Sequence, residues 1–314
     1  SWFYVMVVVT VLLLTELKHT FTEFAQRMKN DEMITLAKFL AISGIILPML
    51  PHKNLIPDIN LTPYSIWLAT VVVSGISYLS YLLKRYVFHE SGVLVSGIIG
   101  GLYSSTATIS VLARKSRKAS AQEANEYVAA MLLAVSMMFL RFMILILIFS
   151  REIFMSIYPY LLIMSVVAAV VAWFIHSRQR RSKDLPADSE EEDSSNPLEF
   201  KVALIFATLF VIFTVLTHYT LVYAGTGGLN LLSFVSGLSD ITPFILNLLQ
   251  NTGSVAVLVV VACSMQAIIS NILVNMFYAL FFAGKGSKLR PWILGGFGTV
   301  IGVNLVLLLF FYFI

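Results

Sequence analysis

Long runs of apolar residues separated by short polar loops cover almost the whole 314-residue sequence. A helix needs about 20 apolar residues to cross a hydrocarbon core of about 30 Å. Runs near this length are predicted to be eight transmembrane helices. They cover residues 2–17, 33–50, 66–83, 126–149, 157–175, 200–222, 254–283 and 292–314. The pattern therefore predicts an all-α polytopic membrane protein.

Two further apolar segments are interrupted by residues that disfavour a continuous helix. Segment 93–113 contains GGLYSSTATIS, in which two glycines precede four hydroxyl residues within the five positions 104–108, and segment 229–249 contains SGLSDITPF. Glycine is common where helices end, and Ser, Thr and Asp are common where they begin. We therefore expect each segment to be broken near its middle.

The positions of the basic residues predict that both broken segments enter and leave on the same side of the membrane. If all ten segments crossed, the basic loops would fall on both sides, contrary to the positive-inside rule. If segments 93–113 and 229–249 are re-entrant hairpins, most of the 21 Lys and Arg residues fall on the cytoplasmic side. These are Lys18, Arg27, Lys29, Lys84, Arg85, Arg114, Lys115, Arg117, Lys118, Arg178, Arg180, Arg181, Lys183, Lys285, Lys288 and Arg290. Because irregular backbone at bilayer depth must be buried or line a cavity, we expect the two hairpin tips to meet.

The sequence also contains a weak internal repeat. A shift of 136 positions places Gly101 on Gly237, and the residues that follow each glycine match in type. Each repeat unit would hold three full crossings, an odd number, so the second unit would be inverted relative to the first. The predicted parts are two N-terminal helices (1–65), repeat unit 1 (66–176), a disordered cytoplasmic linker (177–198) and repeat unit 2 (199–314). The alternative is a chance match, because Gly and Ser are frequent in membrane helices.

Composition excludes several classes of protein. Hydrophobic residues make up 58% of the chain and charged residues 12%, and the net charge of +4 is small and scattered. This charge does not predict nucleic-acid binding. The single cysteine, Cys263, excludes a disulfide within the chain. The sequence has no catalytic, metal-binding or cofactor-binding motif, so we expect no enzymatic activity and no cofactor.

The hairpin tips carry most of the candidate binding residues. Hydroxyl groups follow the first pair of glycines, and at the second tip Thr242 and Pro243 suggest a helix cap and a first-turn proline, with Asp240 just outside the helix. Two helix N-termini would then face one central place. The candidate ligands at the tips are Ser104, Ser105, Thr106, Thr108, Asp240 and Thr242, of which Asp240 is the candidate metal ligand.

Polar residues deep inside two other predicted helices complete the candidate site. Arg141 lies too deep in 126–149 to reach the headgroups easily, and Asp240 is its predicted counter-charge. Arg141 and Asp240 either neutralise each other, or one or both of them contact a permeating solute. In 254–283, Asn271 and Asn275 belong to a polar stripe with Gln266 and Ser270. Such a stripe either joins helices by hydrogen bonds or lines a path.

Several motifs together resemble a known family. The sequence GGLYSSTATISVLARKSRK, with MFLRFMILILI, LPMLP, SIWLATVVVSGISYLSY and SGLSDITPF, is similar to the C-terminal transmembrane domain of unknown function of bacterial MgtC/SapB-type membrane proteins. The resemblance implies a multi-pass protein of the bacterial inner membrane, associated by name with magnesium limitation. Members of the family often carry an MgtC-like domain ahead of this one, which fits a chain that starts at Ser1. The resemblance implies a second acid at the position of Thr242 and a Lys at that of Asn275, and these two departures argue against an essential paired acidic site or Arg/Lys pair in this chain.

We therefore expect a transporter or channel for a small inorganic ion, with its site between the hairpin tips. A cation is favoured slightly, including a divalent one such as magnesium, because of the resemblance. The alternative is a regulatory or scaffold protein that binds another membrane complex and transports nothing. A transporter should have a hydrated cavity at the tips, whereas a scaffold should have dry, packed tips. The expected partners are the lipid bilayer, a small ion, further copies of the chain and an upstream MgtC-like domain, with no nucleic acid.

Overall fold

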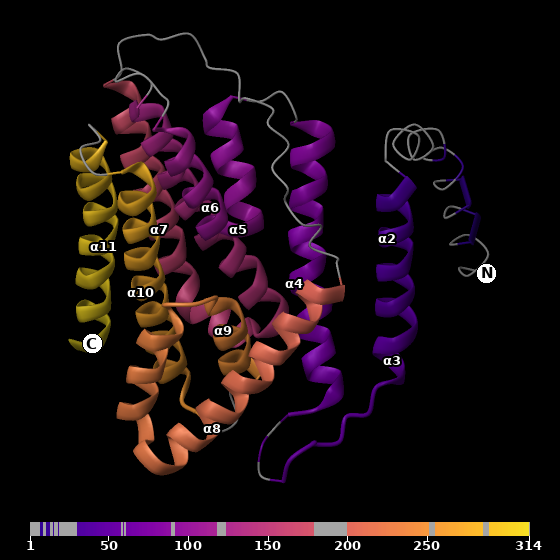
Figure 1. Ribbon diagram of the computed structural model, residues 1–314. Helices are drawn as coiled ribbons and strands as arrows, with labels where there is room; N and C mark the ends of the chain where they lie inside the picture. The colour runs from indigo at the N-terminus through magenta and orange to yellow at the C-terminus, as the bar shows by residue number, and fades with distance from the viewer. Residues whose placement is uncertain are drawn as a thin grey trace. The chain divides into compact units, whose positions relative to one another are not determined.

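The computed structural model is helical over nearly all of the residues that it describes (Figure 1). These are residues 7, 8, 11, 12, 15, 18, 30–57, 59, 61–88, 92–117, 124–178, 200–250, 255–284 and 289–313. They form two units, residues 1–49 and residues 50–314. Within the described ranges, the only β-type pairing is an isolated bridge between Ile56 and Ile59.

Residues 30–49 of the first unit form a helical segment that changes its winding. Helix α2 (Asn30–Ala41) continues through a π-helical stretch (Ile42–Ile46) into α3 (Leu47–Met49). Together they correspond to the helix predicted at 33–50. The helix predicted at 2–17 lies mostly outside the described residues.

The second unit contains the remaining helices. Its first helix is fixed by a capping box, in which Thr62 Oγ1 accepts from the Ser65 backbone N–H and Ser65 Oγ accepts from the Thr62 N–H, with Pro63 at the first helical position. The helices are α4 (Pro63–Leu82, extended by a π-helical turn Leu83–Val87), α5 (Val93–Lys115), α6 (Ala124–Phe149), α7 (Arg151–Ser177), α8 (Phe200–Ser236), α9 (Ile241–Gln250), α10 (Val257–Ala283) and α11 (Arg290–Phe313).

Helix α5 reverses its direction in the middle. Ser104 has an extended backbone conformation (φ −159°, ψ 108°) that divides α5 into residues 93–103 and 105–115. A Cβ atom placed on Gly100 would lie 2.5 Å from Thr108 Oγ1. In a straight helix, residues eight apart are separated by about 12 Å along the axis, at about 1.5 Å per residue. The two halves of α5 therefore fold back on each other as a hairpin.

The second broken segment is formed by the end of α8 together with α9. Gly225 interrupts α8 with a positive φ (φ 61°, ψ −154°) that side chains other than glycine adopt only at a cost. Residues 226–236 then lead through a short turn at residues 237–240 into α9 (Figure 1). Asn271, near the middle of α10, donates hydrogen bonds to this turn. The turn therefore lies beside the centre of a long helix, as the tip of a hairpin would.

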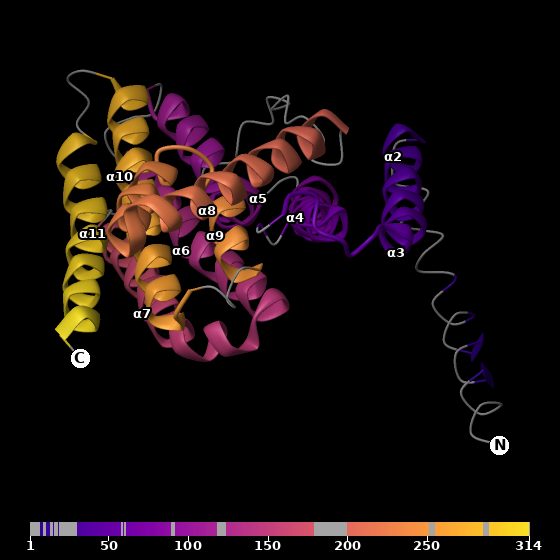
Figure 2. The ribbon, with the colours of Figure 1, turned by 90° about the horizontal axis from the view of Figure 1, so that it is seen from below.

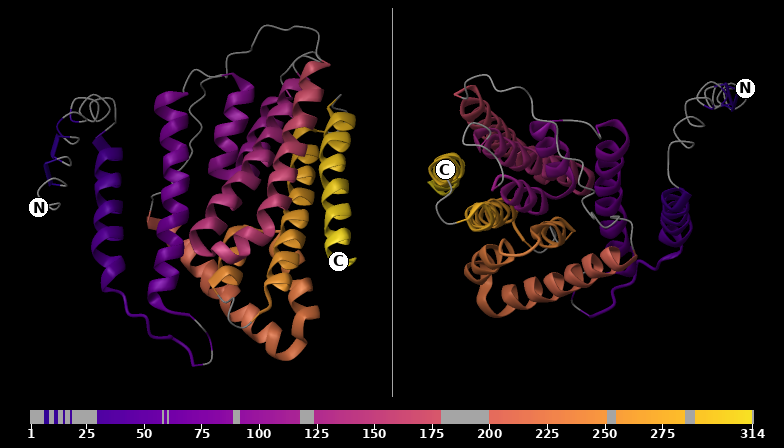
Figure 3. Two further views of the ribbon diagram at one scale, coloured as in Figure 1. Left: turned by 180° about the vertical axis from the view of Figure 1, so that it is seen from behind. Right: turned by 45° about the horizontal axis from the view of Figure 1, so that its top comes forward.

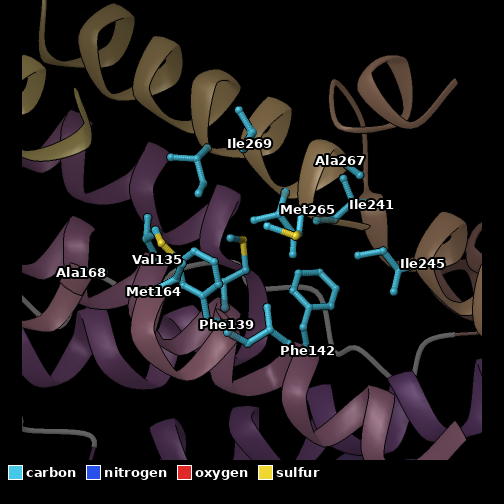
Figure 4. Packing of buried hydrophobic residues seen from close by; sticks show 14 of the residues in the cluster. Val135, Phe139, Phe142, Met164, Ala168, Ile241, Ile245, Met265, Ala267 and Ile269 are labelled. Atoms are coloured by element: carbon cyan, nitrogen blue, oxygen red, sulfur yellow. The ribbon is translucent and has the colours of Figure 1, made fainter. Parts of the chain in front are cut away.

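The core of the second unit joins helices from both halves of the chain. Figure 4 shows Phe139 and Phe142 of α6 together with Ile241 and Ile245 of α9 and with Met265 of α10, all of them buried. Helix α10 is the most buried of the long helices and lies between α11 and α8 (Figure 2). Helices α7 and α11 are also in contact and run in opposite directions (Figure 3, left). Apolar burial therefore holds the two halves together.

Eight of the described helices are long and apolar enough to cross a membrane. Seven of them correspond to predicted helices and the eighth is α5, whereas the helix predicted at 2–17 lies mostly outside the described residues and stays a prediction. Several are longer than predicted: α7 begins at Arg151 rather than at residue 157, and α8 continues to Ser236. The predicted domain boundaries stay predictions, and most of the linker, residues 179–199, lies outside the described residues.

Candidate functional site

A cavity of about 360 Å³ lies where the two hairpin tips meet. Both tips contribute a continuous run of residues to its wall, Tyr103–Thr106 from the first and Leu238–Thr242 from the second. The remaining wall is formed by α4, by Gly101 of α5, by α6, by the first turns of α8 and by α10. These residues are Val73, Ser74, Ser77, Gly101, Met138, Arg141, Phe142, Val202, Ile205, Phe206, Leu209, Asn271, Val274 and Tyr278.

At the first tip, Ser104 ends one half-helix and begins the next. Its Oγ accepts a hydrogen bond of 3.3 Å from the Ala107 N–H, which is the arrangement of an N-cap. Ser105 is buried behind it and Thr106 is partly exposed to the cavity. The first turn of residues 105–115 therefore presents its N-terminal end to the cavity.

At the second tip, the prediction that Thr242 caps the helix is wrong. Helix α9 begins at Ile241, and Asp240 is its cap, because Asp240 Oδ1 accepts a 2.9 Å hydrogen bond from the Thr242 N–H. Thr242 and Pro243 lie inside the first turn. A carboxylate at a helix N-terminus is also favoured by the helix dipole. Asp240 therefore both fixes this tip and exposes a charge to the cavity.

Arg141 connects α6 to the first tip. Its Nη1 donates a 2.7 Å hydrogen bond to the Tyr103 carbonyl oxygen, while its Nε is buried with no hydrogen-bond partner. Asp240 lines the same cavity and interacts with the guanidinium electrostatically. Across the described residues the structure gives Arg141 and Asp240 no direct ion pair. The two opposite charges therefore line the same cavity without pairing directly across it.

The polar stripe of α10 binds the second tip. Asn271 Nδ2 donates to the carbonyl oxygens of Gly237 (3.3 Å) and Ser239 (3.4 Å). Asn275 Nδ2 donates to Asn271 Oδ1 at 3.2 Å, and Asn275 Oδ1 is buried without a partner. Asn271 therefore lines the cavity and holds the tip, whereas Asn275 supports Asn271 from behind.

Seven of the nine predicted site residues come together in this cavity wall. They are Ser104, Ser105, Thr106, Arg141, Asp240, Thr242 and Asn271. The other two are absent from the wall: the Thr108 side chain packs against Gly100 inside the first hairpin, and Asn275 is fully buried. Their assignment as solute ligands therefore has no support from the geometry.

Sequence reasoning missed the polar face of α4. Ser74 and Ser77 line the cavity and lie with Thr70 on a buried polar stripe of an otherwise apolar helix. Their spacing of four and three residues is the periodicity of one helix face, so the signal was present in the sequence. Tyr103 and Tyr278 were also missed, because aromatic residues are common in membrane helices.

A metal ion at Asp240 would find few acidic ligands. Throughout the described ranges no group of three or more His, Cys, Asp or Glu residues is placed to hold a metal. A cation bound here would rely on one carboxylate together with hydroxyl groups, carbonyl oxygens and water. Magnesium is commonly held in this way, by one or two carboxylates and several waters.

Long apolar helices around a charged cavity define a polytopic helical membrane protein. The chain belongs to the family described as "Domain of unknown function (DUF4010)", which matches residues 71–283. That range contains every residue of the cavity wall. An "Uncharacterized protein" of Aquifex aeolicus (strain VF5) is similar, with 26% identity over 220 residues, which cover 69% of this chain and 94% of the relative. No solved structure matches the chain.

Proposed function

We propose that this protein is a membrane transporter whose small charged solute binds between the tips of two re-entrant hairpins. The observation that carries the proposal is the cavity of about 360 Å³ at the tips, lined by Arg141, Asp240 and several hydroxyl groups. Charged groups inside a membrane bundle are costly and commonly mark a solute pathway. A scaffold protein needs no such cavity.

The re-entrant arrangement is supported by length and charge. Each half of α5 has 11 residues and spans about 16 Å at roughly 1.5 Å per residue, which is too short for a hydrocarbon core of about 30 Å. Both ends of the hairpin then lie on one side, with the basic residues Arg114, Lys115 and Arg117 at its exit. This is the cytoplasmic side by the positive-inside rule, in the bacterial inner membrane that the family resemblance implies.

The inverted repeat is supported by equivalent contacts at a shift of 136 residues. Gly101 packs closely against Ala134 in α6, and Gly237 packs closely against Ser270 in α10. One turn earlier, Gly97 lies against the Ala130 backbone, and at the equivalent positions Ser233 Oγ donates a 2.7 Å hydrogen bond to Gln266 Oε1. A constant shift in contacts is harder to obtain by chance than a match of single residues. Inverted repeats with broken helices are common in secondary transporters.

The two sides of the tips differ in packing, which supports alternating access. The cavity wall continues from the tips along Val202 and Ile205 of α8 to Tyr278 near the end of α10. This is the end of the unit at which Arg117 donates hydrogen bonds to the Phe281 and Phe282 carbonyl oxygens. On the other side, residues 241–249 of α9 are all buried. These two observations favour a conformation that is open toward the basic loops and closed on the opposite side.

The expectation of a small ion, with a cation slightly favoured, stays a prediction. Asp240 with the surrounding hydroxyl groups would be the cation ligands, and the resemblance to MgtC/SapB-type proteins directs attention to magnesium. A channel and a coupled transporter both fit a site of this kind. The closed packing around α9 favours a transporter, because a channel needs a continuous path.

Flux into proteoliposomes tests the proposal. The panel should contain Mg²⁺, Na⁺, K⁺, Cl⁻ and small organic solutes, each under an inward gradient with and without a proton gradient. We expect at least one solute to enter well above empty liposomes, with Asp240→Asn and Arg141→Gln reducing the flux about tenfold or more. Arg151→Gln and Glu152→Gln, at exposed positions at the start of α7, are matched controls that should retain flux. If no solute moves under any gradient, the transport proposal is wrong and the result favours the alternative of a scaffold protein.

A further inference from the structure

We infer that the solute is a small zwitterion, with one ammonium group and one carboxylate on an apolar body, rather than a bare inorganic ion. The inference rests on the proposed binding site between the tips and names the chemical class of its ligand. Four features of the cavity carry it: the balance of charge, the hydrogen bonds already made at the tips, the volume and the apolar part of the wall.

The cavity wall contains one cationic and one anionic side chain, Arg141 and Asp240. A bare cation would be attracted to Asp240 but repelled by Arg141 and by the positive ends of the two half-helices. A bare anion would be attracted to Arg141 but repelled by Asp240. A zwitterion satisfies both side chains and adds no net charge to a site of low dielectric constant, where an uncompensated charge is expensive.

Three carbonyl oxygens at the tips that could bind a cation each already accept a hydrogen bond from a side chain. The Tyr103 carbonyl oxygen at the end of the first half-helix accepts from Arg141. The Gly237 and Ser239 carbonyl oxygens at the second tip accept from Asn271. Unwound backbone carbonyls of this kind are the usual cation ligands of broken membrane helices. What the first tip leaves facing the cavity is a helix N-terminus, which favours a carboxylate.

Arg141 has capacity for a carboxylate, and Asp240 has capacity for an ammonium group. Arg141 lines the cavity and makes one hydrogen bond among the described residues, from Nη1 to the Tyr103 carbonyl oxygen, so its Nη2 is left to pair with a carboxylate. Asp240 uses Oδ1 for the Thr242 N–H, which leaves Oδ2 without a hydrogen bond among the described residues. The two charged side chains thus offer one donor site and one acceptor site to the same cavity.

The size and walls of the cavity suit an organic molecule. Its volume of about 360 Å³ falls at the lower end of small-molecule pockets, which are roughly 300–1,000 Å³. A magnesium ion with oxygen ligands at about 2.1 Å needs much less space. Val73, Phe142, Phe206 and Leu209 form an apolar part of the wall. This part would contact an aliphatic body.

Equilibrium binding to the purified full chain in detergent tests the inference with three matched sets of probes. Glycine is compared with acetate and methylamine, L-alanine with propionate and ethylamine, and L-leucine with 4-methylpentanoate and 3-methylbutylamine. MgCl₂ is titrated in parallel. We expect at least one of the amino acids to bind about tenfold or more tightly than both of its singly charged analogues and more tightly than Mg²⁺.

Charge variants show whether the two predicted partners act as assigned. Asp240→Asn keeps a residue that caps helices about as well as Asp, so the tip should still form. This change should weaken binding of the amino acid about tenfold, while the carboxylate analogue should bind as tightly as before or more tightly. Arg141→Gln removes the cation and should weaken binding of the amino acid, while the amine analogue should bind as tightly as before or more tightly. Arg141→Lys, which keeps a cation, is the matched comparison. Arg151→Gln should change none of these affinities.

The inference is overturned if no amino acid binds more tightly than its two analogues, or if Asp240→Asn weakens amino acid and carboxylate analogue equally. Binding and flux of Mg²⁺ or another inorganic ion with no amino-acid binding would overturn the inference while leaving the proposed transport function intact. Flux of no solute at all would instead contradict the proposed function itself.

Discussion

Single glycines set how closely the two hairpins approach their neighbouring helices. A Cβ atom on Gly101 would lie 2.5 Å from Ala134 Cα, and a Cβ atom on Gly237 would lie 2.5 Å from the Ala267 carbonyl oxygen. Both neighbours are backbone atoms of long helices, which cannot move aside cheaply. Small residues at such crossings are the usual way for membrane helices to pack closely. The tips reach their places because these two side chains are absent.

Adding one methyl group at either glycine should therefore destabilise the protein. We expect Gly101→Ala and Gly237→Ala each to cost about 1–3 kcal/mol, the usual cost of overpacking, and the proposed repeat predicts that the two costs are similar. The control is Gly298→Ala on the exposed face of α11, where nothing lies within 4 Å of the added atom. This change should be neutral or slightly stabilising through helix propensity. Denaturant unfolding in detergent micelles measures all three, and equal stability of the three variants would contradict the packing described here.

The cap at the second tip gives a second prediction at this scale. Asp240→Ala removes the acceptor for the Thr242 N–H and should destabilise the protein by about 1 kcal/mol, whereas Asp240→Asn should change stability much less. The same unfolding measurement applies. If Asn and Ala at this position are equally destabilising, the contribution of Asp240 comes from its charge rather than from capping.

At the scale of elements, the sequence predicted which segments break and roughly where. Segment 93–113 divides at Ser104, within the predicted run of hydroxyl residues, because glycine and Ser disfavour a continuous helix there. Helix lengths were predicted less well. The exposed Arg151 and Glu152 begin α7 beyond the apolar run, with Ser150 as its cap, and hydropathy alone does not register that first turn. The cap of α9 was misplaced by two residues, since Asp240 and Thr242 are both good caps and only the geometry distinguishes them.

The orientation of the first hairpin can be tested by labelling. Cys263 is buried and is the only cysteine of the chain, so Cys263→Ala gives a background for single cysteines. We expect Lys115→Cys and Arg181→Cys to react with a membrane-impermeant thiol reagent from the same, cytoplasmic side. Arg151→Cys, at the other end of α7, should react only from the opposite side. Labelling of Lys115→Cys and Arg181→Cys from opposite sides would contradict the re-entrant arrangement.

At the scale of the whole molecule, the sequence predicted the meeting of the two tips but not the shape of the site. The charge pattern predicted two hairpins, and irregular backbone at bilayer depth had to be buried, so the two tips were expected to meet; the cavity has residues 103–106 and 238–242 in one wall. The contributions of Ser74, Ser77 and Tyr278 depend on how α4 and α10 pack against the tips. Thr108 was wrongly grouped with the ligands because sequence spacing does not show that it turns back onto Gly100.

The central claim is that the two tips line a water-filled site that a charged solute can enter. The most direct test is the reaction of Thr106→Cys, in the Cys263→Ala background, with a cationic, water-soluble thiol reagent applied from the cytoplasmic side. Ser165→Cys, buried between α6 and α7, is the control. We predict that Thr106→Cys reacts at least about tenfold faster than Ser165→Cys and that a bound solute slows the reaction. If Thr106→Cys is as unreactive as the buried control, the tips are dry and packed, and the account of a solute site between them is contradicted.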